Sequence, residues 1–182
     1  MELPRCVCQP HWFPAPAAFL NSRRSTRSEP VLLLPVRTME NTRPLRILHI
    51  DDSDDDALVL SRVLRNCTHP TSLKWCSGAP EAIEFLEKAG PDEVPDVILC
   101  DIKMPIMNGH EFIRWLRQSR CKTVTVVVLS SSDLMEDIRE AYALGANSFL
   151  IKPLAASEIL TMMNAAVEYW RRCNLVQRRA DV

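Results

Sequence analysis

The sequence has no apolar stretch long enough to cross a membrane and no excess of charge of either sign. A transmembrane helix needs about 20 apolar residues in succession, and no run among the 182 residues approaches that length. The 22 lysines and arginines are balanced by 23 aspartates and glutamates, so the formal net charge is -1. This balance removes the broad electrostatic reason to expect nucleic-acid binding. We therefore expect no membrane location and no direct contact with nucleic acid.

The cysteines lack any paired spacing. There are seven of them, an odd number, and several lie within apolar runs, where a reduced thiol behaves as a small hydrophobe. This usage indicates a reducing, cytoplasmic location. Cys6, Cys8 and His11 lie close together but lack a fourth ligand and the regular spacing of a structural zinc site, so we expect no metal there.

The segment 1–44 has seven prolines and no glycine. It shows no sustained helical or strand periodicity, so its composition predicts a disordered extension. Met39 stands just before the first strand-like run, and a true translation start at Met39 is the alternative to an extension. The folded domain is expected to span 45–175, followed by a short tail over 176–182.

From Arg46 onward, short β-rich runs alternate with amphipathic helical segments. The strand candidates are mostly apolar along their length, which suits a parallel sheet covered on both faces. They are Arg46–Ile50, Ser72–Trp75, Val97–Cys100, Val124–Leu129 and Ser148–Ile151. This alternation predicts an α/β fold with a doubly wound, five-stranded parallel sheet, in the order 2-1-3-4-5.

Local signals place the starts of the helices. The acidic run 54–56 is expected to stabilise the positive end of the first helix dipole, and we assign it no catalytic role. Asp133 with Glu136 resembles a capping box for the fourth helix, which Gly145 would end. His110 is expected to begin the third helix on its solvent side.

Polar residues stand at the carboxyl ends of the strands, where ligands gather in an open parallel sheet. They are Asp51 and Asp52 after the first strand, Asp101 after the third, Ser130 after the fourth and Lys152 after the fifth. Neighbouring carboxylates repel one another unless they are protonated or bridged by a cation, and oxygen ligands of this kind suit Mg²⁺. A carboxylate can also attack phosphorus to form an acyl phosphate when nearby positive charge offsets the incoming anion. The cluster therefore predicts Mg²⁺ binding and phosphoryl transfer to a carboxylate.

Four ordered sequence blocks resemble the CheY-like response regulator receiver domain. They are Ile50-Asp51-Asp52-Ser53, Cys100-Asp101-Ile102-Lys103-Met104-Pro105 with Met107-Asn108-Gly109, Leu129-Ser130-Ser131, and Phe149-Leu150-Ile151-Lys152-Pro153. The resemblance runs from about Arg46 to Trp170 and implies a flavodoxin-like fold. The segments 141–149 and 168–170 are similar to single-domain regulators of the group that includes partners of bacterial phytochromes.

By this resemblance, Asp101 is the phosphoacceptor. Asp52 and Asp101 would ligate Mg²⁺ directly, Asp51 would act mostly through water, and the backbone carbonyl of Lys103 would complete the protein ligands. A smaller polar residue is frequent at the position of Lys103. The lifetime of the phosphorylated state therefore does not follow from the sequence.

The resemblance also implies the residues of a switch. Ser130 takes the place of the switch hydroxyl, where threonine is commoner, and Phe149 takes the place of the switch aromatic residue. Lys152 would bind the phosphoryl group, and the peptide bond from Lys152 to Pro153 is expected to be cis.

The function implied is that of a single-domain response regulator in a two-component phosphorelay. The phosphodonor would be a sensor histidine kinase or a histidine phosphotransfer protein. About a dozen residues follow Trp170, too few for an output domain, so a downstream protein is expected to bind the face of helix four, strand five and helix five. Homodimerisation on phosphorylation stays open. We expect self-phosphorylation and self-dephosphorylation but no other enzymatic activity.

Two alternatives come from other classes of protein. A pseudo-receiver would bind partners without being phosphorylated, which the intact Asp52, Asp101 and Lys152 argue against. A haloacid dehalogenase-type phosphatase would explain Asp52-Ser53-Asp54. That class, however, requires Thr or Val where Asp56 stands, and a larger chain to hold a cap and a second acidic motif.

Overall fold

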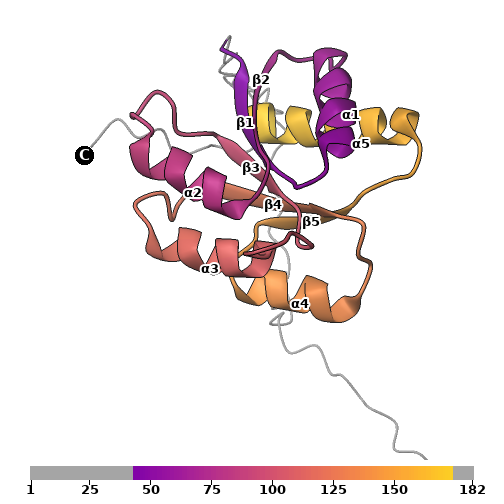
Figure 1. The fold of residues 1–182 in the computed structure, drawn as a ribbon. Helices are drawn as coiled ribbons and strands as arrows, with labels where there is room; N and C mark the ends of the chain where they lie inside the picture. Colours follow the sequence, from indigo (N-terminus) through magenta and orange to yellow (C-terminus); the bar gives the residue numbers. More distant parts are fainter. Residues whose placement is uncertain (1–42, 174–182) are drawn as a thin grey trace, which may run out of the picture. The chain divides into compact units, whose positions relative to one another are not determined.

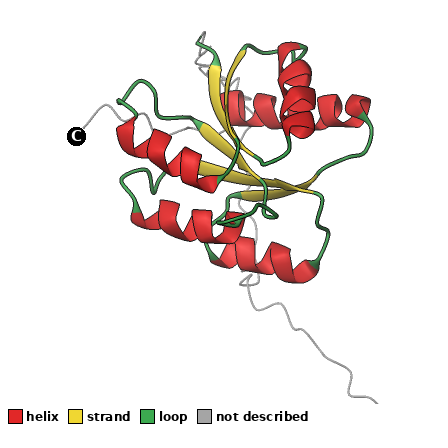
Figure 2. Ribbon diagram, viewed as in Figure 1, coloured by secondary structure: helices red, strands yellow, loops and turns green. Residues whose placement is uncertain are grey.

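The computed structural model describes residues 43–173, which form a parallel sheet with helices on both faces (Figures 1 and 2). The strands are β1 (Leu45–Ile50), β2 (Thr71–Cys76), β3 (Val97–Cys100), β4 (Thr125–Ser130) and β5 (Ser148–Ile151). Their order in the sheet is β2-β1-β3-β4-β5, as predicted. Each predicted strand matches the observed one to within one residue at either end.

Two sets of helices cover the sheet. The helices are α1 (Asp54–Arg65), α2 (Ala79–Lys88), α3 (Gly109–Gln118), α4 (Met135–Ala143) and α5 (Ala156–Glu168), with a π-helical turn, η1 (Tyr169–Cys173), directly after α5. Figure 1 shows α1 and α5 on one face and α2, α3 and α4 on the other. None of the helices within 43–173 is long and apolar enough to span a membrane.

The central strands supply both halves of the core. Their side chains alternate between the faces, so that Leu48 and Ile98 pack with residues of α2 and α3, whereas Ile47 and Leu99 pack with residues of α1 and α5. All residues of β3 and β4 are buried. This burial explains the near-continuous apolar sequence of these strands.

Helix α1 begins as predicted. Ser53 is its N-cap, with the side chain accepting a hydrogen bond from the backbone N–H of Asp56 at 3.2 Å, and the acidic run 54–56 forms the first turn. Helix α3 begins with a full capping box between Asn108 and Glu111. Both arrangements satisfy backbone N–H groups that a helix start leaves without partners.

The predicted capping box of α4 is wrong. The N-cap residue is Leu134, which provides no side-chain hydrogen bond, because Asp133 lies one position too early. The expected end of the helix is confirmed, since Gly145 adopts φ 98° and its N–H donates to the carbonyl of Tyr142.

The predicted cis bond before Pro153 is also wrong. No cis peptide bond occurs in 43–173. Proline reduces the preference for trans to about 0.5–1 kcal/mol without reversing it, so the sequence does not decide the isomer.

Some predictions fall on residues outside the described range. Most of the extension, the tail over 176–182 and the Cys6, Cys8 and His11 group lie there. Within the described range, Cys67, Cys76, Cys100 and Cys121 are free thiols, as the sequence predicts.

Candidate functional site

The structure brings the predicted carboxylates together at the carboxyl end of the sheet. Oxygen atoms of Asp51, Asp52 and Asp101 all lie within 4.8 Å of one another. Adjacent β1 and β3 position them, because the two strands run parallel with Ile50 beside Cys100 and so end at the same level. Asp51 and Asp101 are buried, whereas Asp52 is exposed. The group has the spacing and the oxygen donors to hold one hard divalent cation.

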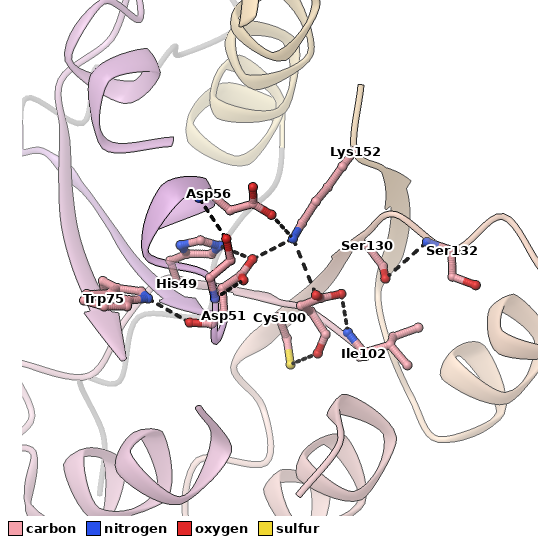
Figure 3. A network of polar contacts seen from close by, with 11 residues as sticks. His49, Asp51, Asp56, Trp75, Cys100, Ile102, Ser130, Ser132 and Lys152 are labelled. Carbon is pink, nitrogen blue, oxygen red and sulfur yellow. Dashed lines mark hydrogen bonds and ion pairs between the residues drawn. The ribbon is translucent and has the colours of Figure 1, made fainter. Parts of the chain in front are cut away.

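Lys152 reaches this cluster from the end of β5 (Figure 3). Its Nζ lies 2.7 Å from Asp51 Oδ2 and 3.5 Å from Asp101 Oδ2. A third contact, at 2.7 Å, is made to Oδ2 of Asp56. Burial disfavours the ammonium form, but the hydrogen bonds to Asp51 and Asp56 and the charge of Asp101 outweigh it and raise the pKa of Lys152. The lysine is therefore a fixed positive charge at neutral pH.

Asp51 is fully buried and held on several sides. Burial alone would raise the pKa of its carboxyl, but contacts with His49 and Lys152 and the hydrogen bond from Ser53 N–H outweigh burial and lower the pKa to about 2. The Ser53 N–H lies 3.0 Å from Oδ1. The indole N–H of Trp75, on β2, donates to the backbone carbonyl of Asp51 at 2.9 Å (Figure 3). These contacts keep the carboxylate ionised in a buried position.

One carboxylate oxygen of Asp101 accepts a backbone hydrogen bond, and the other faces Lys152. The backbone N–H of Ile102 donates to Oδ1 at 2.7 Å, and Oδ2 is the oxygen 3.5 Å from Lys152. The start of α3 packs directly against this residue, because a Cβ on Gly109 would lie 2.2 Å from the Asp101 carbonyl oxygen. Only glycine permits that approach.

The loop between β3 and α3 also carries Lys103, the predicted carbonyl ligand. Lys103 is exposed, and the turn closes through hydrogen bonds to the Ile102 carbonyl from Met104 and Gly109 rather than to the Lys103 carbonyl. Ile106 in the same loop has φ 71° and is 94% exposed. A positive φ is unfavourable for a β-branched residue.

The switch residues lie beside the cluster. Ser130 ends β4, is fully buried, and accepts a hydrogen bond from Ser132 N–H at 3.4 Å. Its backbone carbonyl accepts from Lys152 N–H at 2.8 Å, which ties β4 to β5 just at the site. Phe149 is partly buried and packs against the cluster formed with α2 and α3.

Sequence reasoning missed two side chains of the site. Asp56, read only as a helix-dipole residue, hydrogen-bonds Lys152. His49, on β1, is buried, and its Nε2 lies 3.3 Å from Asp51 Oδ2. The spacing of these residues carries a signal for each of them. His49 precedes Asp51 by two residues at the end of a strand, and Asp56 follows Asp52 by four residues at a helix start, which are the spacings of residues on one face of a strand and of a helix.

The predicted solvent exposure of His110 is wrong. This residue is 7% exposed because α4 covers it. Its Nε2 lies 3.1 Å from the Asp137 carbonyl oxygen, and its Nδ1 lies 3.5 Å from Glu140 Oε2. The sequence of α3 alone does not reveal which neighbouring helix lies over it.

Comparison with known proteins gives the family. The sequence profile of the response regulator receiver domain matches residues 47–164. The chain therefore belongs to the response regulator receiver family.

Individual relatives resemble the chain at moderate identity. FilR2 of Methanothrix harundinacea, a probable methanogenesis regulatory protein, is 29% identical over 72% of this chain and 87% of its own length. The response regulator Rcp1 of Synechocystis sp. is 28% identical over 72% of this chain and 92% of its own length. The match covers 58% of the rice response regulator ORR1 and 18% of the sensory protein RpfC of Xanthomonas campestris. The chain thus corresponds to nearly all of some relatives and to one part of others.

Solved structures agree with the fold. The phosphorylated cyanobacterial phytochrome response regulator RcpA has a TM-score of 0.67 at 25% identity, over 74% of this chain and 99% of that one. The Mn²⁺-bound form of Rcp1 has a TM-score of 0.64 at 27% identity, over 73% of this chain and 99% of that one. The likeness thus extends over the whole of both single receiver domains.

Proposed function

We propose that this protein is a phosphorylation switch in which Asp101 accepts a phosphoryl group from a histidine kinase or a histidine phosphotransfer protein. The observation that carries the proposal is the joint position of three carboxylates within 4.8 Å and an ammonium 3.5 Å from the Asp101 oxygen. RcpA is described as a phytochrome response regulator, so a phytochrome-type kinase is one candidate donor. The family match argues against the haloacid dehalogenase alternative.

The residues of the site divide the chemistry among them. Asp101 Oδ2 attacks phosphorus while the bond to the donor nitrogen breaks, and Lys152 offsets the charge on the transferred group. Mg²⁺, held by Asp52 and Asp101 with Asp51 and the Lys103 carbonyl, would neutralise further phosphoryl charge. The exposure of Asp52 and the Mn²⁺-bound form of Rcp1 support a divalent ion here.

The response begins at Ser130. In the proposed active state its hydroxyl donates to a phosphoryl oxygen, which changes its contact with Ser132 N–H, and Phe149 moves with it. The affected surface is formed by α4, β5 and the start of α5. Exposed apolar residues on and beside these elements support protein binding there: Leu134, Met135, Tyr142, Ile151 and Leu154. A downstream protein or a second copy of the chain would bind this face.

We place the protein in the cytoplasm, with output through protein contact rather than through nucleic acid or membrane. Its chemistry is limited to gaining and losing its own phosphoryl group.

Labelling with acetyl phosphate and Mg²⁺ tests the phosphoacceptor. Wild-type protein should gain the mass of one phosphoryl group, lost with hydroxylamine, and Asp101→Asn should gain none because the nucleophile is removed. Asp55→Asn is the matched control, since it removes a carboxylate that lies outside the cluster. It should label like wild type.

Two outcomes would contradict the proposal. Full labelling of folded Asp101→Asn would mean that another residue is the acceptor. Failure of wild type to label with acetyl phosphate, phosphoramidate or a phosphorylated kinase would favour the pseudo-receiver.

A further inference from the structure

Lys152 is shared between two carboxylates that the phosphoacceptor chemistry does not use as nucleophiles. Its Nζ lies 2.7 Å from Asp51 and 2.7 Å from Asp56, but 3.5 Å from Asp101 (Figure 3). Asp56 stands apart from the cation-binding cluster. It projects from the first turn of α1, where the Ser53 cap fixes its backbone N–H.

We infer that Asp56 is a positioning residue that holds the Lys152 ammonium in the unphosphorylated protein and competes with the phosphoryl group for it afterwards. The inference rests on the proposed phosphorylation of Asp101. It gives Asp56 a part in setting how long the phosphorylated state lasts.

The competition follows from the position of the ammonium. The two shortest contacts of Lys152 go to Asp51 and Asp56, and the contact to Asp101 is longer, at 3.5 Å. Full engagement of a phosphoryl group on Asp101 draws the ammonium toward that group and so lengthens at least one of the two short contacts.

Burial decides which partner loosens. The side chain of Asp51 is 1% exposed, and leaving it without the ammonium would strand a buried charge. The side chain of Asp56 is 47% exposed, so water can replace the ammonium at little cost. Asp56 is therefore the partner that yields, and its pull on Lys152 weakens the hold on the phosphoryl group.

The test is Asp56→Asn beside Asp55→Asn. Both variants remove one negative charge from the same helical turn, but no ion pair to Asp55 occurs within 43–173, whereas Asp56 binds Lys152. After labelling with acetyl phosphate and removal of the donor, phosphorylated Asp56→Asn should lose its phosphoryl group about two- to fivefold more slowly than wild type, as expected for one exposed ion pair. Asp55→Asn should decay at the wild-type rate.

The same substitution in a Lys152→Ala variant distinguishes a positioning role of Asp56 from a general effect on the structure. In Lys152→Ala the change Asp56→Asn should no longer alter the decay rate, because no ammonium remains to be shared. Asp56→Glu, which keeps the charge, should restore decay toward the wild-type rate. Thermal melts of each variant show that the compared proteins are folded.

The outcomes are distinguishable from those of the proposed function. If wild type never labels, the proposed function fails and this inference falls with it. If wild type labels but Asp56→Asn decays like wild type or like Asp55→Asn, only the role of Asp56 is overturned. Persistence of the Asp56→Asn effect in Lys152→Ala would overturn it as well.

Discussion

Each end of the sheet buries an aspartate, and the two aspartates have different charged partners. At the amino end, the carboxylate of Asp96 accepts hydrogen bonds from both terminal nitrogens of Arg43, at 2.7 and 3.0 Å. It also accepts one from the backbone N–H of Arg46 at 3.0 Å. At the carboxyl end, Asp51 shares one ammonium with Asp56 and Asp101. Asp96 is 5% exposed and Asp51 is fully buried.

The difference lies in charge balance rather than burial. Two guanidinium groups face the single carboxylate of Asp96, so its negative charge is fully compensated. At the other end, one lysine serves several carboxylates, and the excess negative charge can be relieved by a cation. A cluster whose carboxylate is fully compensated stabilises the fold, whereas a cluster with uncompensated carboxylates retains the capacity to bind a cation and to react.

The largest effect is expected at the amino end. Asp96→Ala should destabilise the protein by about 2–3 kcal/mol, because it removes several charge-assisted hydrogen bonds, while the partly exposed arginines can turn to water. Urea denaturation measures the change. Arg114→Ala is a control, since its 3.7 Å ion pair with Glu140 is exposed and should contribute little. A loss below about 0.5 kcal/mol for Asp96→Ala would contradict a structural role for this cluster.

The next largest effect is expected at the carboxyl end of the sheet, where acid should lower the stability of the protein by protonating Asp51. The pKa of Asp51 is lowered from 3.8 to about 2 in the folded protein. Because the folded value is below the unfolded one, the ionised carboxylate favours folding above pH 4, and this contribution of about 2 kcal/mol is lost as the pH falls toward 2. Denaturation at a series of acidic pH values should show a shallower loss for Asp51→Asn than for wild type. Equal slopes would mean that Asp51 is not ionised at an unusually low pH.

A smaller effect of opposite sign is expected from the unbalanced charge. Without divalent ions, Asp52→Asn should stabilise the protein by about 1 kcal/mol, since it relieves repulsion within the cluster. Millimolar Mg²⁺ should stabilise wild type and have less effect on this variant. Thermal melts with EDTA and with Mg²⁺ measure both effects, and calorimetry measures the binding itself. An unchanged Mg²⁺ isotherm in Asp52→Asn would remove Asp52 from the site.

Much of the fold could be predicted because the determining signals are local. The strands follow from their apolar runs, and the residues just after the strands identify Asp51, Asp101 and Lys152 from the sequence alone. The sequence could not predict how Lys152 divides its hydrogen bonds, because that depends on where α1 places Asp56 in space. The same reason accounts for Asp96, whose partners Arg43 and Arg46 are some 50 residues away.

The unequal starts of the two helices beside the site have a consequence for hydrogen exchange. Helix α3 begins with a capping box and lies against the Asp101 backbone through Gly109, whereas α4 begins at Leu134 without a side-chain cap. First-turn amides of α4 therefore need less free energy to open locally than those of α3. Amide protection should fall earlier along α4 than along α3, so that α4 can open locally without disturbing the position of Asp101.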